Sequence, residues 1–168
     1  MEIYEGHCLC GECRYFIRGK PIDAGYCHCN VCRRACGGPV VVWATFLRTG
    51  FESLGEPLGE YVTSSGNVRK FCKKCGSSLL LLCVEEPTTI DVNVASLVDP
   101  QSVSPDYHIW CQSQLSWFDT RDSLPRFGDR GPDSARGRAM ACAISAKDTN
   151  QTPKGKSDSS LSEPVGKL

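Results

Sequence analysis

Three sets of closely spaced cysteines carry sulfurs that could bind a metal ion. Two of the sets are pairs, Cys8 with Cys10 and Cys72 with Cys75. Zinc prefers four soft or borderline ligands in a tetrahedron. In a strand, Cys8 and Cys10 would project to one face, because side chains alternate. The second pair, with Gly76 after it, has the pattern of a zinc knuckle, so both pairs indicate metal binding. Paired buried thiols without a metal are the alternative.

The third set, Cys27, Cys29 and Cys32, supplies three ligands. Three protein ligands with an open fourth position distinguish catalytic zinc sites from structural ones. His28 would point to the opposite face of a strand and is not expected to bind the same ion. Cys36 lies one helical turn after Cys32, so a closed site with Cys36 as its fourth ligand is an alternative.

Spacing alone does not decide which sets share an ion, because Cys8 and Cys10 could instead join Cys27 and Cys29. Iron in place of zinc is a further alternative, which a colourless protein would exclude. An open site of three thiolates suits a soft fourth ligand such as a substrate sulfur. The expected chemistry is therefore the making or breaking of a carbon–sulfur bond in a thiol conjugate.

The composition narrows the class of protein. The 168 residues include 12 cysteines, and 19 basic residues balance 19 acidic ones. This balance leaves no excess of positive charge that would indicate binding to nucleic acid or to an anionic membrane. The first residues have acidic and polar side chains where a signal peptide needs a basic stretch and an apolar run. We therefore expect a cytoplasmic protein in a reducing compartment, with the nucleus left open and the oligomeric state undetermined.

Short β-branched and aromatic stretches recur between turn residues, which predicts a mainly β body. The expected strands cover residues 13–17, 24–29, 40–46, 60–64, 68–71, 78–84, 89–94 and 107–112. A short helix is expected over 31–37, with Asn30 as its N-cap and Gly37 as its stop, and a second helical turn near 115–118.

The chain divides into a body, residues 1–127, and a tail, residues 128–168. The tail contains no aromatic residue and is rich in Ser, Gly, Pro and charge. Such a segment buries too little apolar surface to offset its ordering entropy, so we expect it to be disordered.

Several other side chains could support chemistry at the three-cysteine set. Arg33, Arg34 and Arg69 could bind a substrate carboxylate, and solvated arginines are the alternative. His108 and Trp110 would share a strand face and line the pocket, with His108 as a proton carrier. A packing histidine is the alternative for His108. Ser64 could donate a hydrogen bond to substrate or simply form a turn.

The strings GHCLCGECRY, CHCNVCRRACGG, RKFCKKCGSSL and HIW occur in this order. They resemble the glutathione-dependent formaldehyde-activating enzyme family, which includes the centromere protein V type. The resemblance runs from Gly6 to about Phe127. It implies an Mss4-like fold of small antiparallel sheets with zinc-binding loops and one or two short helices.

The resemblance also implies two zinc ions per chain. The structural zinc falls on Cys8, Cys10, Cys72 and Cys75, and the catalytic zinc falls on Cys27, Cys29 and Cys32. The implied activity is that of a carbon–sulfur lyase acting on a small thiol adduct such as S-hydroxymethylglutathione. A non-catalytic zinc scaffold of the centromere protein V type is the alternative. Cys13, Cys36 and Cys111 depart from the family pattern and leave the natural substrate open.

Overall fold

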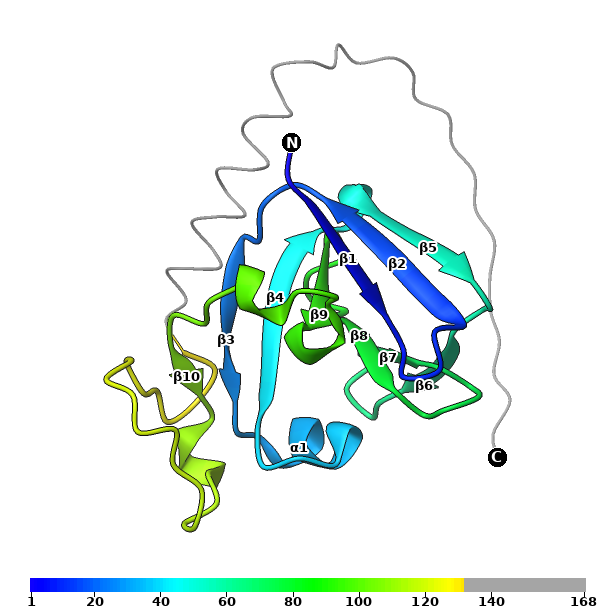
Figure 1. Ribbon diagram of the computed structural model, residues 1–168. Coiled ribbons are helices and arrows are strands. Elements are labelled where there is room, and N and C mark those ends of the chain that lie inside the picture. The colour runs from blue at the N-terminus through cyan, green and yellow to red at the C-terminus, as the bar shows by residue number, and fades with distance from the viewer. Residues whose placement is uncertain (132–168) are drawn as a thin grey trace, which may run out of the picture.

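The structure is a computed structural model, and it describes residues 1–131 (Figure 1). Within this range ten strands form two sheets. The smaller sheet has the order β1-β2-β5 and is antiparallel throughout. Its strands are β1 (Ile3–His7), β2 (Cys13–Arg18) and β5 (Phe51–Gly55).

The larger sheet has seven strands in the order β10-β3-β4-β9-β8-β7-β6. Its pairs are antiparallel, except that β10 runs parallel to β3. The strands are β3 (Asp23–Cys27), β4 (Val41–Leu47), β6 (Gly59–Val62), β7 (Val68–Phe71), β8 (Ser78–Leu82), β9 (Thr89–Asn93) and β10 (His108–Ile109). The mainly β fold of small sheets with one short helix is thus confirmed.

The core lies between the two sheets. Along β2 the buried residues Cys13, Tyr15 and Ile17 alternate with outward-facing ones, which is the pattern of a strand with one covered face. They pack with residues of the larger sheet such as Phe46 and Val92, both nearly or fully buried. Each fully buried large aliphatic or aromatic side chain contributes roughly 1.5–3 kcal/mol to stability.

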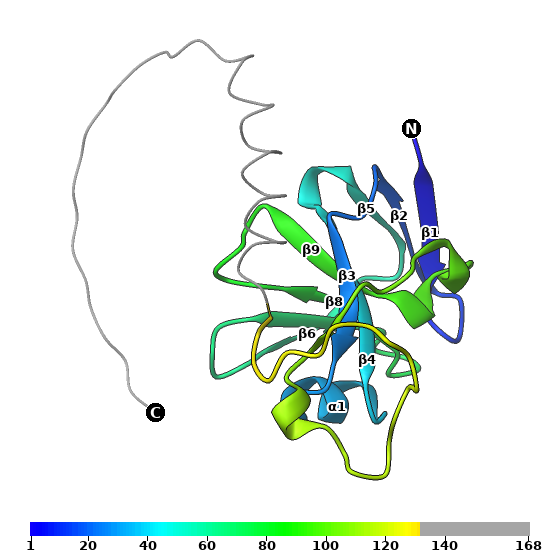
Figure 2. The ribbon, with the colours of Figure 1, turned by 90° about the vertical axis from the view of Figure 1, so that its left-hand side faces the viewer.

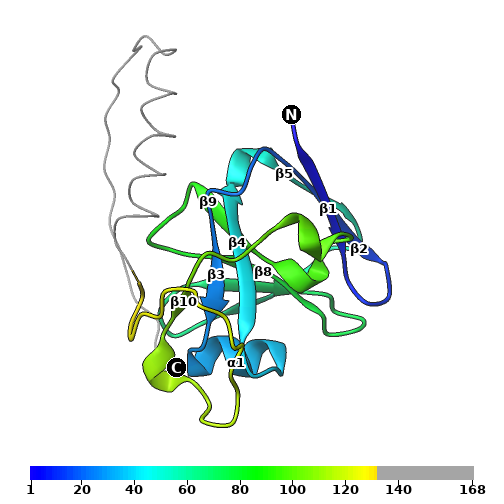
Figure 3. The same ribbon diagram turned by 60° about the vertical axis from the view of Figure 1, so that its left-hand side comes forward.

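The helix α1 (Asn30–Cys36) lies between the end of β3 and the start of β4 (Figure 1), next to the loop that follows β10 (Figures 2 and 3). Its N-cap is Cys29, whose Sγ accepts the backbone N–H of Cys32 at 3.2 Å. The predicted N-cap, Asn30, is therefore wrong by one residue, because a cysteine sulfur replaces the usual oxygen acceptor. Gly37 ends the helix as predicted, with a φ of 67° and its N–H on the Arg33 carbonyl.

Four short 3₁₀ helices also occur within the described residues. They are η1 (Arg48–Gly50), η2 (Val94–Ser96), η3 (Pro100–Ser102) and η4 (Cys111–Ser113). Where a second helical turn was predicted, residues 115–118 form one hydrogen-bonded turn, with the Phe118 N–H on the Leu115 carbonyl, and the nearest 3₁₀ helix is η4.

The expected strand over 107–112 is reduced to the two residues of β10, because Trp110 takes the left-handed conformation with a φ of 58°. The chain then returns past β10: the Trp110 N–H bonds the Asp129 carbonyl at 2.6 Å, and the Cys111 N–H bonds the Phe127 carbonyl at 2.9 Å. The hydrogen-bonded body thus extends beyond the boundary expected at Phe127. Disorder is expected for the tail, residues 128–168. Its residues from 132 onward lie outside the described range. No helix of the described range is long and apolar enough to cross a membrane.

Candidate metal centres

The first candidate centre is a group of four sulfurs from two distant segments. The Sγ atoms of Cys8, Cys10, Cys72 and Cys75 all lie within 4.8 Å of one another. Sulfur–sulfur distances of 3.4 Å (Cys8 to Cys10) and 3.7 Å (Cys10 to Cys72) approach the edge of about 3.8 Å that follows from tetrahedral zinc–sulfur bonds. The donor set therefore fits zinc, and the alternative pairing of Cys8 and Cys10 with Cys27 and Cys29 is wrong.

Two tight turns present these sulfurs. Cys8 and Cys10 lie in the turn after β1, closed by the Gly11 N–H on the Cys8 carbonyl, and not in a strand as predicted. The knuckle after β7 is closed by the Gly76 N–H on the Cys72 carbonyl. The Leu9 N–H donates to Ser77 Oγ at 3.0 Å and joins the two turns directly. The group thus offers four ligands, the number that closes a tetrahedral metal site.

A fifth sulfur, that of Cys13, lies beside this group. The Cys13 N–H donates to Cys8 Sγ at 3.3 Å, and Cys13 is buried. Burial, together with the neighbouring thiols, raises the pKa of Cys13 to about 12. The side chain therefore stays a neutral thiol that packs against the four-sulfur group.

The second candidate centre contains three sulfurs. Cys27 ends β3, Cys29 caps α1 and Cys32 lies in the first turn of α1, and their Sγ atoms lie within 4.8 Å of one another. Cys36 does not belong to this group, since its Sγ contacts the carbonyl oxygens of Arg33 at 3.6 Å and Val40 at 3.9 Å. The arrangement therefore favours the open site over the alternative that Cys36 closes.

The three thiols hydrogen-bond to one another. Hydrogen bonds from Cys27 and then from Cys32 lower the pKa of Cys29 to about 2. The same bond to Cys29 raises the pKa of Cys27. Cys29 Sγ also accepts a backbone N–H of α1, which lowers the pKa of Cys29 further.

Aromatic side chains form one wall of the three-sulfur group. Cys27 packs with Trp43 and Tyr107, and Trp110 and Phe127 pack against this cluster. A Cβ atom on Gly25 would come within 2.5 Å of the Trp43 ring, so the glycine allows the indole to lie against β3. The wall excludes water from one side of the sulfurs, which strengthens their interaction with any charge placed there.

Arg69 on β7 also contacts the group. Its Nη2 donates to Cys32 Sγ at 3.3 Å. The structure thus brings Arg69 and Trp110, both predicted as substrate-binding residues, to the three sulfurs.

Three other predicted residues lie elsewhere. Arg33 donates from Nε to the His28 carbonyl at 3.1 Å and contacts the Asn30 side chain, so it holds the start of α1. Arg34 is exposed on α1. Ser64 is exposed in the β6–β7 turn, which is closed by the Gly66 N–H on the Thr63 carbonyl.

His108 faces away from the sulfurs. In the parallel pairing of β10 with β3 it lies opposite Tyr26, and their rings stack at 4.4 Å, whereas Cys27 points to the other face. His108 and His28 are both fully buried, and Asp122 contacts His108 Nε2. The packing alternative thus describes His108 better than a proton carrier at the sulfurs. Sequence reasoning missed Asp122, for which no local pattern exists.

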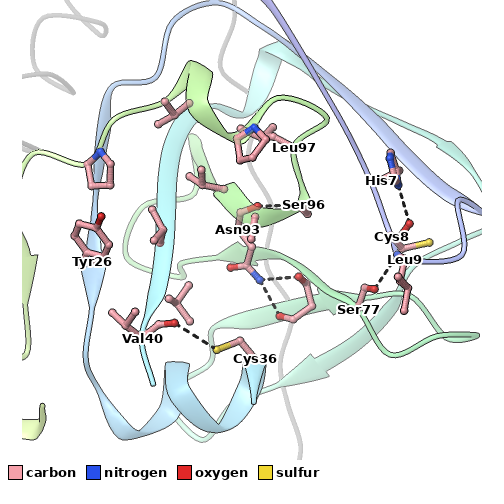
Figure 4. Close-up of a pocket in the computed structure, with 18 residues that line it drawn as sticks. His7, Cys8, Leu9, Tyr26, Cys36, Val40, Ser77, Asn93, Ser96 and Leu97 are labelled. Atoms are coloured by element: carbon pink, nitrogen blue, oxygen red, sulfur yellow. Dashed lines mark hydrogen bonds between the residues drawn. The ribbon is translucent and has the colours of Figure 1, made fainter. Parts of the chain in front are cut away.

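A cavity of about 790 Å³ also lies away from the three sulfurs (Figure 4). Tyr26, Cys36 and Asn93 are among its lining residues, whereas Cys27, Cys29 and Cys32 do not line it. Figure 4 shows Cys36 at its lower edge, bonded to Val40.

Comparisons with known proteins give a family match, a similar protein sequence and a similar solved structure. The sequence profile of the glutathione-dependent formaldehyde-activating enzyme family matches residues 3–113, a range that contains all seven candidate ligands. An uncharacterised lyase of Schizosaccharomyces pombe is 34% identical over 127 residues, which are 76% of this chain and 92% of the lyase. A crystal structure of a Rhodobacter sphaeroides protein aligns with a TM-score of 0.48 and 22% identity over 73% of this chain and 98% of that one.

Proposed function

Since the chain belongs to the glutathione-dependent formaldehyde-activating enzyme family, we propose that it is a zinc-dependent carbon–sulfur lyase. Its proposed substrate is a small thiol adduct of the S-hydroxymethylglutathione kind. The observation that carries the proposal is the group of three sulfurs that Cys36 does not complete.

We assign two zinc ions to each chain. The structural ion belongs to Cys8, Cys10, Cys72 and Cys75, and the catalytic ion belongs to Cys27, Cys29 and Cys32. A zinc ion held by Cys27, Cys29 and Cys32 would supply a soft fourth position suited to a substrate sulfur and would favour its thiolate form.

The protein's own residues complete the proposed site. Cys29 and Cys32 are held at the start of α1, so the positions of their sulfurs depend on the helix cap. Trp43, Tyr107 and Trp110 cover one side and keep water from the reacting carbon. Arg69 supplies positive charge next to Cys32 and offsets the charge of the thiolates.

Turnover of S-hydroxymethylglutathione tests the proposal. We expect zinc-loaded protein to accelerate the exchange between this adduct and formaldehyde plus glutathione, and Cys29→Ser to abolish the acceleration. Cys83→Ser, a change of a half-buried cysteine outside both sulfur groups, is the matched control and should retain activity. If the protein neither turns over thiol adducts nor binds a thiol at the three-cysteine site, the lyase proposal fails and the scaffold alternative takes its place.

A further inference from the structure

The guanidinium of Arg69 has one N–H that is bonded to the three-sulfur group and another that has no partner among the described residues. Its Nη2 donates to Cys32 Sγ at 3.3 Å. Its Nε is buried and, within residues 1–131, has no hydrogen-bond partner. A buried donor without a partner costs free energy, so this N–H requires an explanation.

The planar geometry of arginine says where the free N–H lies. The Nε–H and one Nη2–H lie on the same edge of the guanidinium and are parallel, like two prongs of a fork. One Nη2–H is directed at Cys32 Sγ, and Nε and Nη2 are bonded to the same carbon, so the free Nε–H lies close to that sulfur. An acceptor atom beside that sulfur would complete a bidentate contact.

The cationic residues that follow Cys32 and Arg69 in the sequence have other partners. Arg33 bonds the His28 carbonyl and Asn30, and Lys70 pairs with Glu60. Arg69 is held in the sheet, opposite Tyr61 on β6 and Leu81 on β8, so its backbone position is fixed by pairing on both sides. The fork is therefore preorganised, and a ligand does not have to order it.

We propose that Arg69 determines which thiol adducts the open site accepts, by donating its Nε–H to an oxygen on the carbon next to the substrate sulfur. In an S–C–O group a single carbon separates sulfur from oxygen. The sulfur can therefore lie beside Cys32 while the oxygen meets the neighbouring N–H. The favoured class is hemithioacetals and related S–C–O compounds, and plain thiols and thioethers are disfavoured. This inference rests on the proposed function, because it requires the substrate sulfur at Cys27, Cys29 and Cys32.

The same contact acts on the reaction. When the hydroxyl of a hemithioacetal loses its proton to water, the oxygen becomes an alkoxide. The carbon–oxygen double bond then forms as the carbon–sulfur bond breaks, and the electron pair of that bond leaves on sulfur. A charged N–H donor aimed at the alkoxide stabilises it before the bond breaks. Arg69 thus recognises the atom on which charge develops.

Two small ligands test the inference without turnover. Thioacetate contains the S–C–O group, and ethanethiol has the same skeleton without the oxygen. Each is titrated into the full-length, zinc-loaded protein, and binding is followed by the fluorescence of Trp43 and Trp110, which lie at the site. The measured quantity is the ratio of the two dissociation constants, so differences in thiol basicity cancel between variants.

The variants are Arg69→Met, Arg69→Lys and, as a matched control, Arg48→Met, which removes an exposed arginine of η1. We expect Arg69→Met to lower the preference for thioacetate about tenfold or more, as for loss of one charge-assisted hydrogen bond. Arg69→Lys keeps the charge without the fork and should lose the preference as well. Arg48→Met should leave the ratio at the wild-type value.

Three results would overturn the inference. An unchanged ratio in Arg69→Met shows that Nε does not meet the oxygen. A ratio retained in Arg69→Lys shows that charge alone is sufficient. Failure of wild-type protein to bind either ligand contradicts the proposed function itself. Metal content and thermal melts of each variant are measured first, and if Arg69→Met does not fold, Arg69→Lys and Arg69→Gln decide the question.

Discussion

His28 Nε2 lies 2.9 Å from His108 Nδ1, and both imidazoles are fully buried. His108 Nε2 lies 3.1 Å from both carboxylate oxygens of Asp122. A hydrogen bond from Thr120, with others from Leu124 and His108, lowers the pKa of Asp122 to about 2, so this carboxylate is ionised and accepts the His108 Nε2–H. When His108 is neutral, its Nδ1 accepts the Nε2–H of His28. The chain of bonds leaves His28 Nδ1 without a proton, which agrees with its having no partner in the described range.

Asp122→Asn should disturb this chain of hydrogen bonds. The amide removes the charge that holds the His108 tautomer, and we expect a loss of about 1–3 kcal/mol in the free energy of unfolding. Thermal or urea unfolding measures the loss, and nitrogen NMR of the imidazoles reports the tautomers. Asp106→Asn, at an exposed position, is the control. Equal stability of the two variants, with unchanged tautomers, would show that Asp122 does not orient the histidines.

The two sulfur groups should respond differently to loss of one cysteine. Cys72→Ser removes a buried ligand that ties residues near Cys8 to the knuckle, so we expect a loss of several kcal/mol or failure to fold. Cys29→Ser affects a half-buried sulfur at the start of α1, and the protein should stay folded while losing its activity. Circular dichroism melts compare the two. A similar fall in melting temperature for both would contradict the division into a structural and a catalytic site.

Metal should leave the two groups in a fixed order. Four thiolates hold an ion more tightly than three, so mild chelation should first remove one ion per chain and with it the activity. Elemental analysis of fresh and partly chelated protein measures this, and the melting temperature should stay nearly constant over the first step. Loss of both ions in a single step, together with unfolding, would argue against unequal sites.

Alkaline pH should destabilise the protein through Tyr15. The Ser96 hydroxyl donates to the Asn93 carbonyl at 2.7 Å, so the Tyr15 O–H is the donor in its 2.6 Å bond to Ser96. Burial raises the pKa of Tyr15 to about 12, whereas an unfolded tyrosine titrates near about 10. Between these values the unfolded chain releases a proton that the folded chain keeps, so the free energy of unfolding falls as pH rises.

Tyr15→Phe should therefore reduce the fall in the free energy of unfolding at alkaline pH. It should also lower this free energy by roughly 1 kcal/mol at neutral pH, because the hydrogen bond to Ser96 is lost. Urea unfolding at about pH 8 and about pH 11 measures both effects. An equally steep alkaline loss in the phenylalanine variant would assign it to other groups.

Local patterns predicted the elements whose stability is local. The bounds of β7 are as predicted, and β2 differs by one residue, since alternation and turn residues mark both. The sequence pattern did not reveal β1 and β5. They lie at the edges of the smaller sheet with mostly exposed residues, so they show little apolar alternation. The length of β10 was overestimated, because the strand ends where Trp110 takes the left-handed backbone conformation.

In the candidate site, too, local patterns predicted only the features that depend on local sequence. The two sulfur groups could be predicted because metal binding requires particular residues at short spacing. Which of the three candidate arginines contacts a sulfur, and that His108 faces away from the sulfurs, could not be predicted, since both depend on which sheet face each strand turns toward Cys27. The N-cap at Cys29 was missed because a metal-ligand residue also performs a backbone role there.

The parallel pairing of β10 with β3 has a consequence for biosynthesis. All ligands of the four-sulfur group are present once Cys75 has left the ribosome, and the three other candidate ligands have emerged by then as well. The aromatic wall around Cys27, however, needs Tyr107 and Phe127, which are synthesised much later. Nascent chains emerge at roughly 5–20 residues per second, so several seconds pass between the emergence of Cys75 and that of Phe127. The four-sulfur group can therefore assemble on an incomplete chain, whereas the three-sulfur group stays uncovered until synthesis has passed Phe127.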